Sequence, residues 1–142
     1  LFPEMRELLF FLKEKKIIIA LVTGKGRRSC DVSLEYYGLS NFFHWIETGS
    51  PSGPCKPEGI LRILKHFQLK PEETVYIGDT TSDILASHEV GVPVIAAGWA
   101  STTNQEELQK MSPDKFCSTV SDLKNVLEKC LNDRFHFPSH KL

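Results

Sequence analysis

The chain has 142 residues, a length that suits one domain, and its 41% hydrophobic and 25% charged residues are typical of a globular protein. The net charge of −1 gives no basic field to favour nucleic acid or an anionic membrane, and no apolar run approaches the roughly 20 residues that span a bilayer. The four cysteines include no C-x-x-C pair, so we expect reduced thiols in a cytoplasmic protein rather than a zinc site.

Hydrophobic periodicity predicts helices that alternate with short strands along the chain. The expected helices are Pro3–Glu14, Arg27–Tyr37, Pro57–Phe67, Ser82–Val90, Asn104–Met111 and Val120–Leu131. The expected strands are Ile17–Val22, Phe42–Thr48, Thr74–Ile77 and Val92–Ala97, with a short one near Lys115–Ser118. A loop rich in Gly, Pro and Ser covers Gly49–Pro57.

The strands at Ile17–Val22, Thr74–Ile77 and Val92–Ala97 are continuous apolar runs, which indicates burial on both faces. We therefore predict an α/β fold, in which a Rossmann-like parallel sheet lies between two layers of helices. Residues 1–131 are expected to form this core, and residues 132–142 a C-terminal tail.

Polar groups follow the first of these strands and the Gly/Pro-rich loop. Thr23 and Gly24 come directly after Val22, and Lys56 precedes Pro57 at the start of a helix. Ligands of open α/β sheets bind beyond the carboxyl ends of the strands, where a hydroxyl, a backbone amide and a cation suit a phosphate group. Each signal is weak alone, because Thr-Gly also forms ordinary turns and a lysine before a helix is usually solvated.

Two carboxylates follow the strand at Thr74–Ile77. Asp79 lies at the mouth of the strand, and Asp83 lies four residues further on, in the first turn of a helix. Two oxygen ligands there suit Mg²⁺, which keeps water and a substrate phosphate as its other ligands. The alternative is structural: Asp79 begins a turn, and Asp83 stabilises the positive end of the helix.

Taken in order, these segments resemble motifs II, III and IV of the haloacid dehalogenase (HAD) superfamily. The matching strings are Leu21-Val22-Thr23-Gly24, Lys56-Pro57-Glu58-Gly59-Ile60 and Val75-Tyr76-Ile77-Gly78-Asp79-Thr80-Thr81-Ser82-Asp83. Gly91-Val92-Pro93-Val94-Ile95, Trp99 and Pro113-Asp114 are similar to the phosphoglycolate phosphatase-like branch.

The resemblance implies a Mg²⁺-dependent phosphohydrolase acting on a small phosphorylated metabolite. Thr23 and the Gly24 amide would hold phosphoryl oxygens, and Lys56 would neutralise charge on the nucleophile and the transferred group. Asp79 would bind Mg²⁺, with Asp83 as a further ligand or a support. Stabilising charge by position is most of the catalytic contribution in phosphoryl transfer.

The sequence departs from the family at its first motif, D-x-D-x-T/V. The first Asp of that motif forms an aspartyl-phosphate and the second is the general acid/base, but this sequence contains no Asp-x-Asp. Leu1–Met5 resembles the element that follows the family's helical cap, so we expect the first strand and the cap to be missing at the N-terminus. The resemblance places that strand between Ile17–Val22 and Thr74–Ile77, and we predict that a separate segment, a swapped strand or a rearranged sheet replaces it. The chain alone is predicted to be inactive.

Two other functions fit parts of the sequence. A non-catalytic HAD-like fragment or pseudo-enzyme that binds phosphorylated ligands would need no nucleophile. A dinucleotide-binding domain is suggested by Gly24-x-Gly26-x-x-Ser29, with Glu47 near the expected ribose-binding distance, but Ser29 replaces the third glycine.

Overall fold

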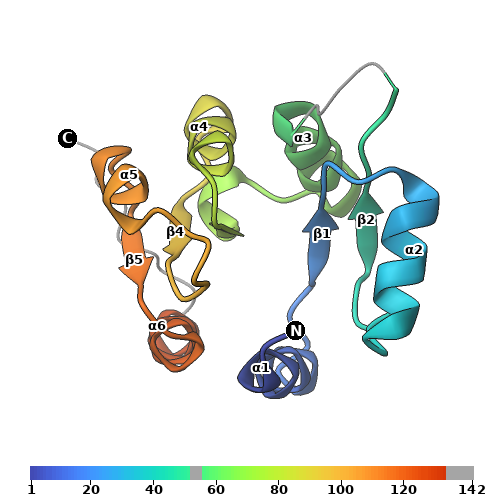
Figure 1. The fold of residues 1–142 in the computed structure, drawn as a ribbon, viewed down its shortest axis with the longest axis horizontal. Helices are drawn as coiled ribbons and strands as arrows, with labels where there is room; N and C mark the ends of the chain where they lie inside the picture. Colours follow the sequence, from blue (N-terminus) through green and yellow to red (C-terminus); the bar gives the residue numbers. More distant parts are fainter. Residues whose placement is uncertain (52–55, 134–142) are drawn as a thin grey trace. The chain divides into compact units, whose positions relative to one another are not determined.

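The structure is a computed structural model that describes residues 1–51 and 56–133 (Figure 1). The chain divides into two compact units, Leu1–Ile63 and Leu64–Leu142. Within the described residues, no helix combines the length and the apolar character needed to cross a membrane. The prediction of one core over residues 1–131 stays a prediction. Most of the expected tail, residues 134–142, lies outside the described residues.

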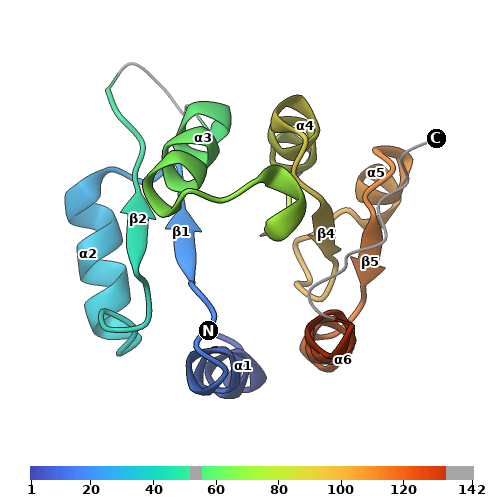
Figure 2. The same ribbon diagram turned by 180° about the vertical axis from the view of Figure 1, so that it is seen from behind.

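The first unit holds a two-stranded parallel sheet and the helices around it. Its elements are α1 (Pro3–Glu14), β1 (Ala20–Val22), α2 (Arg27–Tyr36), β2 (Trp45–Glu47) and the beginning of α3 (Lys56–Phe67). Figure 2 shows β1 and β2 side by side and pointing the same way, with Leu21 opposite Ile46 and Val22 opposite Glu47.

The alternation of side chains along β1 and β2 separates the two helix layers of this unit. Leu21 and Ile46 pack against a buried cluster to which α1 contributes Leu9 and α2 contributes Leu34. The next residues along the strands face α3, because a Cβ added at Gly59 would lie 3.3 Å from Cβ of Glu47 and 3.6 Å from Cγ1 of Val22. The small sheet therefore separates α3 from α1 and α2.

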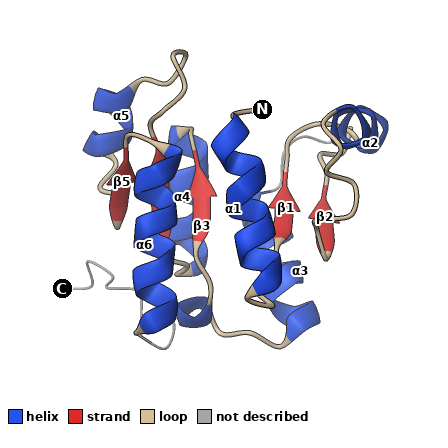
Figure 3. Ribbon diagram, turned by 90° about the horizontal axis from the view of Figure 1, so that it is seen from below, coloured by secondary structure: helices blue, strands red, loops and turns tan. Residues whose placement is uncertain are grey.

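The second unit holds a three-stranded parallel sheet in the order β3-β4-β5. Its remaining elements are a 3₁₀ turn (Pro71–Glu73), β3 (Tyr76–Gly78), α4 (Thr81–Val90), β4 (Val94–Ala97), α5 (Gln105–Lys110), β5 (Lys115–Cys117) and α6 (Val120–Asn132). Ile84 of α4 and Leu108 of α5 form a buried cluster with Val94 and Ala96 of β4. Figure 3 shows α6 on the other side of this sheet from α4. The prediction of an α/β fold with parallel strands between helices is confirmed.

One expectation about the strands is wrong. All four residues of β4 are buried, but every residue of β1 is only half-buried, and Ile18 and Ile77 are 42% and 38% exposed. The cause is the pairing: β4 has a neighbour on each side, whereas β1 pairs only with β2 and β3 only with β4 among the described residues. No ladder joins β1 to β3 within the described residues. Of the three strands expected to be fully buried, only β4 is buried on both faces and paired on both edges.

Candidate phosphate and metal site

The loop between β1 and α2 exposes several backbone and hydroxyl groups. Thr23 is half-buried and its Oγ1 accepts a hydrogen bond from the Lys25 amide at 3.2 Å. Gly24 is exposed, and a Cβ added there or at Gly26 would meet no described atom within 4 Å. Gly26 is the N-cap of α2 and offers no side-chain acceptor, so the first amides of α2 donate no hydrogen bond to a capping side chain. This combination can bind an anion.

The end of β2 supports this loop through backbone contacts. The Thr23 amide donates to the Glu47 carbonyl at 3.0 Å, and the Gly49 amide donates to the Lys25 carbonyl at 2.8 Å. A Cβ at Gly49 would lie 2.2 Å from the Gly24 carbonyl oxygen, a distance that no side chain tolerates. Glycine at position 49 therefore allows the two loops to approach each other closely.

Lys56 is the first residue of α3 and is half-buried. The preceding residues 52–55, which belong to the expected Gly/Pro-rich loop, lie outside the described residues. Thr23, Gly24 and Lys56 all belong to the first unit.

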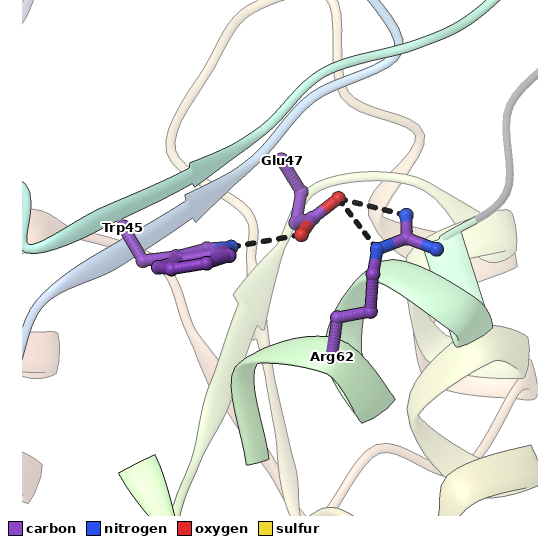
Figure 4. A network of polar contacts seen from close by, with 3 residues as sticks. All are labelled: Trp45, Glu47 and Arg62. Atoms are coloured by element: carbon purple, nitrogen blue, oxygen red, sulfur yellow. Dashed lines mark hydrogen bonds and ion pairs between the residues drawn. The ribbon is translucent and has the colours of Figure 1, made fainter. Parts of the chain in front are cut away.

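A polar network links α3 to β2 in the same unit (Figure 4). Arg62 donates from Nε and Nη2 to Oε2 of Glu47 at 3.0 and 2.7 Å, and Trp45 donates from Nε1 to Oε1 at 2.8 Å. The hydrogen bond from Arg62 is the main reason that the pKa of Glu47 lies below its usual value, against the opposing effect of burial. Glu47 was the ribose-binding candidate of the dinucleotide interpretation, and both its oxygens bind protein groups here.

The two carboxylates of the metal candidate have different surroundings. Asp79 is exposed at the carboxyl end of β3, whereas Asp83 is 5% exposed. Oδ2 of Asp83 accepts from the Thr80 amide at 3.1 Å and from Oγ1 of Thr80 at 2.7 Å, and Oδ1 accepts from the Tyr76 hydroxyl at 3.0 Å. The Asp83 amide in turn donates to Oγ1 of Thr80, which completes a capping box at the start of α4.

Burial, together with the charge of Asp83 and its hydrogen bond, raises the pKa of Tyr76 well above its usual value, and the charge of Asp79 adds to the shift. The hydroxyl therefore remains protonated and donates to Asp83. Both carboxylates thus act electrostatically on one phenol.

The structure groups the predicted site residues into two sets. Thr23, Gly24 and Lys56 lie in the first unit, and Asp79 and Asp83 lie in the second. Across the part of the chain that the structure describes, no three His, Cys, Asp or Glu side chains form a group that could hold a metal ion. Carboxylate oxygens are ligands that suit Mg²⁺, and the exposed Asp79 fits a direct ligand better than Asp83, whose two oxygens accept hydrogen bonds.

Sequence reasoning missed several supporting residues. Tyr76 and Thr80 hold Asp83, Gly49 allows the close approach to Gly24, and Arg62 binds Glu47. The capping box could have been found from the Thr80-x-x-Asp83 spacing. Nothing in the spacing of Glu47 and Arg62 indicates their contact.

Comparisons with known proteins agree with the motifs. The profile of a family described as haloacid dehalogenase-like hydrolase matches residues 1–97. A phosphoglycolate phosphatase of Synechococcus elongatus is 27% identical over 123 residues, covering 87% of this chain and 57% of the relative. Pyrophosphatase PpaX of Anoxybacillus flavithermus is 33% identical over 118 residues, covering 82% of this chain and 54% of the relative.

Solved structures show the same fold. A haloacid dehalogenase-like family hydrolase from Streptococcus pneumoniae aligns with a TM-score of 0.77 at 27% identity, covering 90% of this chain and 59% of that one. A predicted phosphatase from Clostridium acetobutylicum aligns with a TM-score of 0.83 at 21% identity, covering 90% of this chain and 60% of that one. The chain thus spans little more than half the length of these relatives.

Proposed function

The chain belongs to the haloacid dehalogenase-like hydrolase family, and on that premise we propose that it forms the phosphate-binding and metal-binding part of a phosphatase. The substrate class is a small phosphorylated metabolite, as the phosphatase names of the relatives suggest. We further propose a location in the cytoplasm, a compartment that suits the buried free thiols of Cys30, Cys117 and Cys130.

The observation that carries this proposal is the loop from Thr23 to Gly26. It combines a hydroxyl, two exposed glycines and a helix start without a side-chain cap. The helices α4, α5 and α6 of the second unit instead have their first amides capped by Thr80, Asn104 and Thr119. The positive end of α2 is therefore available to a phosphoryl group.

The proposed roles follow from the groups present. Thr23 and the Gly24 amide hold phosphoryl oxygens, and Lys56 neutralises the charge that develops on them. Asp79 holds Mg²⁺ directly, Asp83 supports the turn that carries it, and the ion when bound offsets the negative charge of the phosphate. In this scheme an Asp carboxylate from outside the chain attacks phosphorus, the leaving alkoxide takes a proton from a second Asp, and water hydrolyses the aspartyl-phosphate.

The open edges of β1 and β3 support a complementing strand. Each pairs with one neighbour only among the described residues, and Ile18 just before β1 and Ile77 within β3 are exposed. We propose that a strand carrying the Asp-x-Asp sequence, from a separate N-terminal segment, pairs with an open edge of this kind.

A second candidate is a non-catalytic phosphate-binding protein of the same fold. The lack of any Asp-x-Asp in the 142 residues favours it. The two candidates share the phosphate site and differ in turnover.

Titration calorimetry with inorganic phosphate in MgCl₂ tests the shared site. Thr23→Val and Lys56→Met should each weaken phosphate binding by roughly tenfold, because each removes a hydrogen bond or charge pair to an anion. Asp79→Asn should remove the dependence on Mg²⁺. Lys110→Met is the matched control, since Lys110 is an exposed lysine on α5 paired with Glu106. Unchanged binding in both Thr23→Val and Lys56→Met would refute the phosphate site.

Turnover of p-nitrophenyl phosphate separates the two candidates. The chain alone should show none, and activity should appear once a segment with the Asp-x-Asp sequence is supplied. Hydrolysis by the chain alone that Asp79→Ala abolishes would mean that a different nucleophile is present.

A further inference from the structure

We infer that Glu47 and Arg62 are positioning residues for Lys56: their contact fixes α3 on β2 and so sets where the lysine lies relative to the Thr23–Gly26 loop. This inference rests on the proposed phosphate site and adds two residues to it that lie outside the HAD-like motif strings.

The first step is that α3 contacts Glu47 at two points one turn apart. Gly59 brings the helix backbone close to the glutamate, since an added Cβ would lie 3.3 Å from Cβ of Glu47. Arg62, three residues further on, binds the carboxylate through two donors. Residues three apart share a helix face, so both the rotation and the axial position of α3 are fixed against β2.

The second step is that Lys56 follows the same helix. It precedes Gly59 by three residues and thus lies one turn nearer the N-terminus, on the same side of α3. A rotation of α3 by 20° would move a point on its surface by about 2 Å, given a helix diameter of 10–12 Å. That displacement exceeds the range over which a hydrogen bond to a phosphoryl oxygen stays formed.

The third step is that Glu47 also contacts the loop. Its carbonyl accepts the Thr23 amide at 3.0 Å, while its carboxylate binds Arg62 and Trp45. Glu47, at the end of β2, therefore contacts the Thr23–Gly26 loop through its backbone carbonyl and contacts α3, the helix that carries Lys56, through its carboxylate. Figure 4 shows the carboxylate contact with Arg62 of α3.

The surroundings make this contact stronger than an ordinary surface pair. The Glu47 side chain is 13% exposed, and a hydrogen bond from Trp45 holds its second oxygen. Arg62 is 54% exposed and can be replaced without opening a cavity in the core. A partly desolvated carboxylate held by three donors keeps a defined orientation, which is what a positioning role requires.

The experiment is a double-mutant cycle on the binding of inorganic phosphate in MgCl₂, by calorimetry. Glu47→Gln keeps the shape of the side chain and removes its charge, and Arg62→Met keeps the aliphatic stem and removes the guanidinium. Each is measured alone and in the Lys56→Met background. Glu106→Gln, which breaks the exposed Lys110–Glu106 pair at 2.9 Å, is the matched control.

We expect Glu47→Gln and Arg62→Met to weaken phosphate binding about fivefold when Lys56 is present, and by less than about 1.5-fold when it is methionine. For Glu47→Gln, the direction of the change in phosphate affinity separates a geometric effect from an electrostatic one. Loss of a negative charge near an anion site would by itself tighten binding, so weakening requires a geometric cause. Circular dichroism confirms that each variant is folded at the assay temperature.

Tighter or unchanged binding in Glu47→Gln, or equal weakening with and without Lys56, would overturn the positioning role. Failure of the phosphate site itself looks different. In that case the wild-type chain binds no phosphate, or Lys56→Met binds it as well as the wild type does.

Discussion

Gly78→Ala tests how tightly the Asp83 carboxylate is fixed beneath the end of β3. An alanine Cβ at position 78 would lie 2.4 Å from Cβ of Asp83 and 2.7 Å from its Oδ2, about 1 Å closer than ordinary van der Waals contact. The strand cannot move away easily, because Gly78 is paired with Ala96 of the fully buried β4. The displacement therefore falls on the Asp83 side chain.

The cost follows from what Asp83 would lose. Its oxygens accept hydrogen bonds of 2.7, 3.0 and 3.1 Å, and a shift of 1 Å takes each beyond bonding range. A hydrogen bond to a charged group contributes about 1.5–3 kcal/mol, but the three losses are not additive, and overpacking alone costs about 1–3 kcal/mol. We expect the substitution to lower the free energy of unfolding by about 3 kcal/mol.

Urea denaturation followed by circular dichroism measures this loss. With a slope of about 1.5 kcal/mol per molar urea, the midpoint should fall by roughly 2 M. Gly24→Ala is the control, because its added Cβ meets no described atom within 4 Å. A loss below about 0.5 kcal/mol for Gly78→Ala, equal to that of the control, would refute the idea that Asp83 is rigidly held.

Four further predictions concern the second unit and the end of α3. Tyr76→Phe removes the hydroxyl that donates to Asp83 and should cost about 1.5–3 kcal/mol of unfolding free energy in the same urea assay. Ser87→Ala should be neutral or stabilise by about 1 kcal/mol, because the buried Ser87 Oγ has no partner within the described residues; a clear loss of stability would contradict this. Gln68→Gly should raise the melting temperature, because Gln68 has φ +54° directly after α3 and a left-handed backbone costs a non-glycine residue about 1–2 kcal/mol. An unchanged or lower melting temperature would contradict this prediction. Burial raises the pKa of Cys117 from an ordinary 9.0 to about 11, so the fold favours the neutral thiol. The neutral Cys117 thiol contributes its full stability below pH 9, and this contribution is lost as the pH rises to 11. The urea midpoint should therefore fall across that range, and it should fall less in Cys117→Ala.

The elements were predictable because the hydrophobic pattern is regular. Strand β4 combines β-branched residues with neighbours on both edges, and its expected burial is found. The same inference failed for β1 and β3. An apolar run indicates that a strand can be buried, but burial also requires a neighbouring strand on each of its edges. The edge of a sheet is a property of pairing partners and has no local sequence signal.

The candidate site shows the same division between local and non-local information. Thr23, Lys56 and Asp79 could be proposed because each adjoins an element end that periodicity reveals. The contact between Glu47 and Arg62 joins residues 15 apart on different elements, and only the packing of α3 on β2 brings them together. Supporting residues of this kind depend on tertiary structure, so sequence motifs do not identify them.

The structural and functional interpretations of Asp83 are compatible. Its hydrogen bonds with Thr80 cap α4, as the structural interpretation expects. Those bonds also close the turn from Gly78 to Asp83, and Asp79 lies inside that turn with its side chain exposed. A metal ligand must reach the ion and also be held in a fixed place, and neighbouring groups that do not bind the ion usually help to hold it. In the proposed site, two carboxylates four residues apart divide these tasks: the buried Asp83 fixes the turn, and the exposed Asp79 binds the ion.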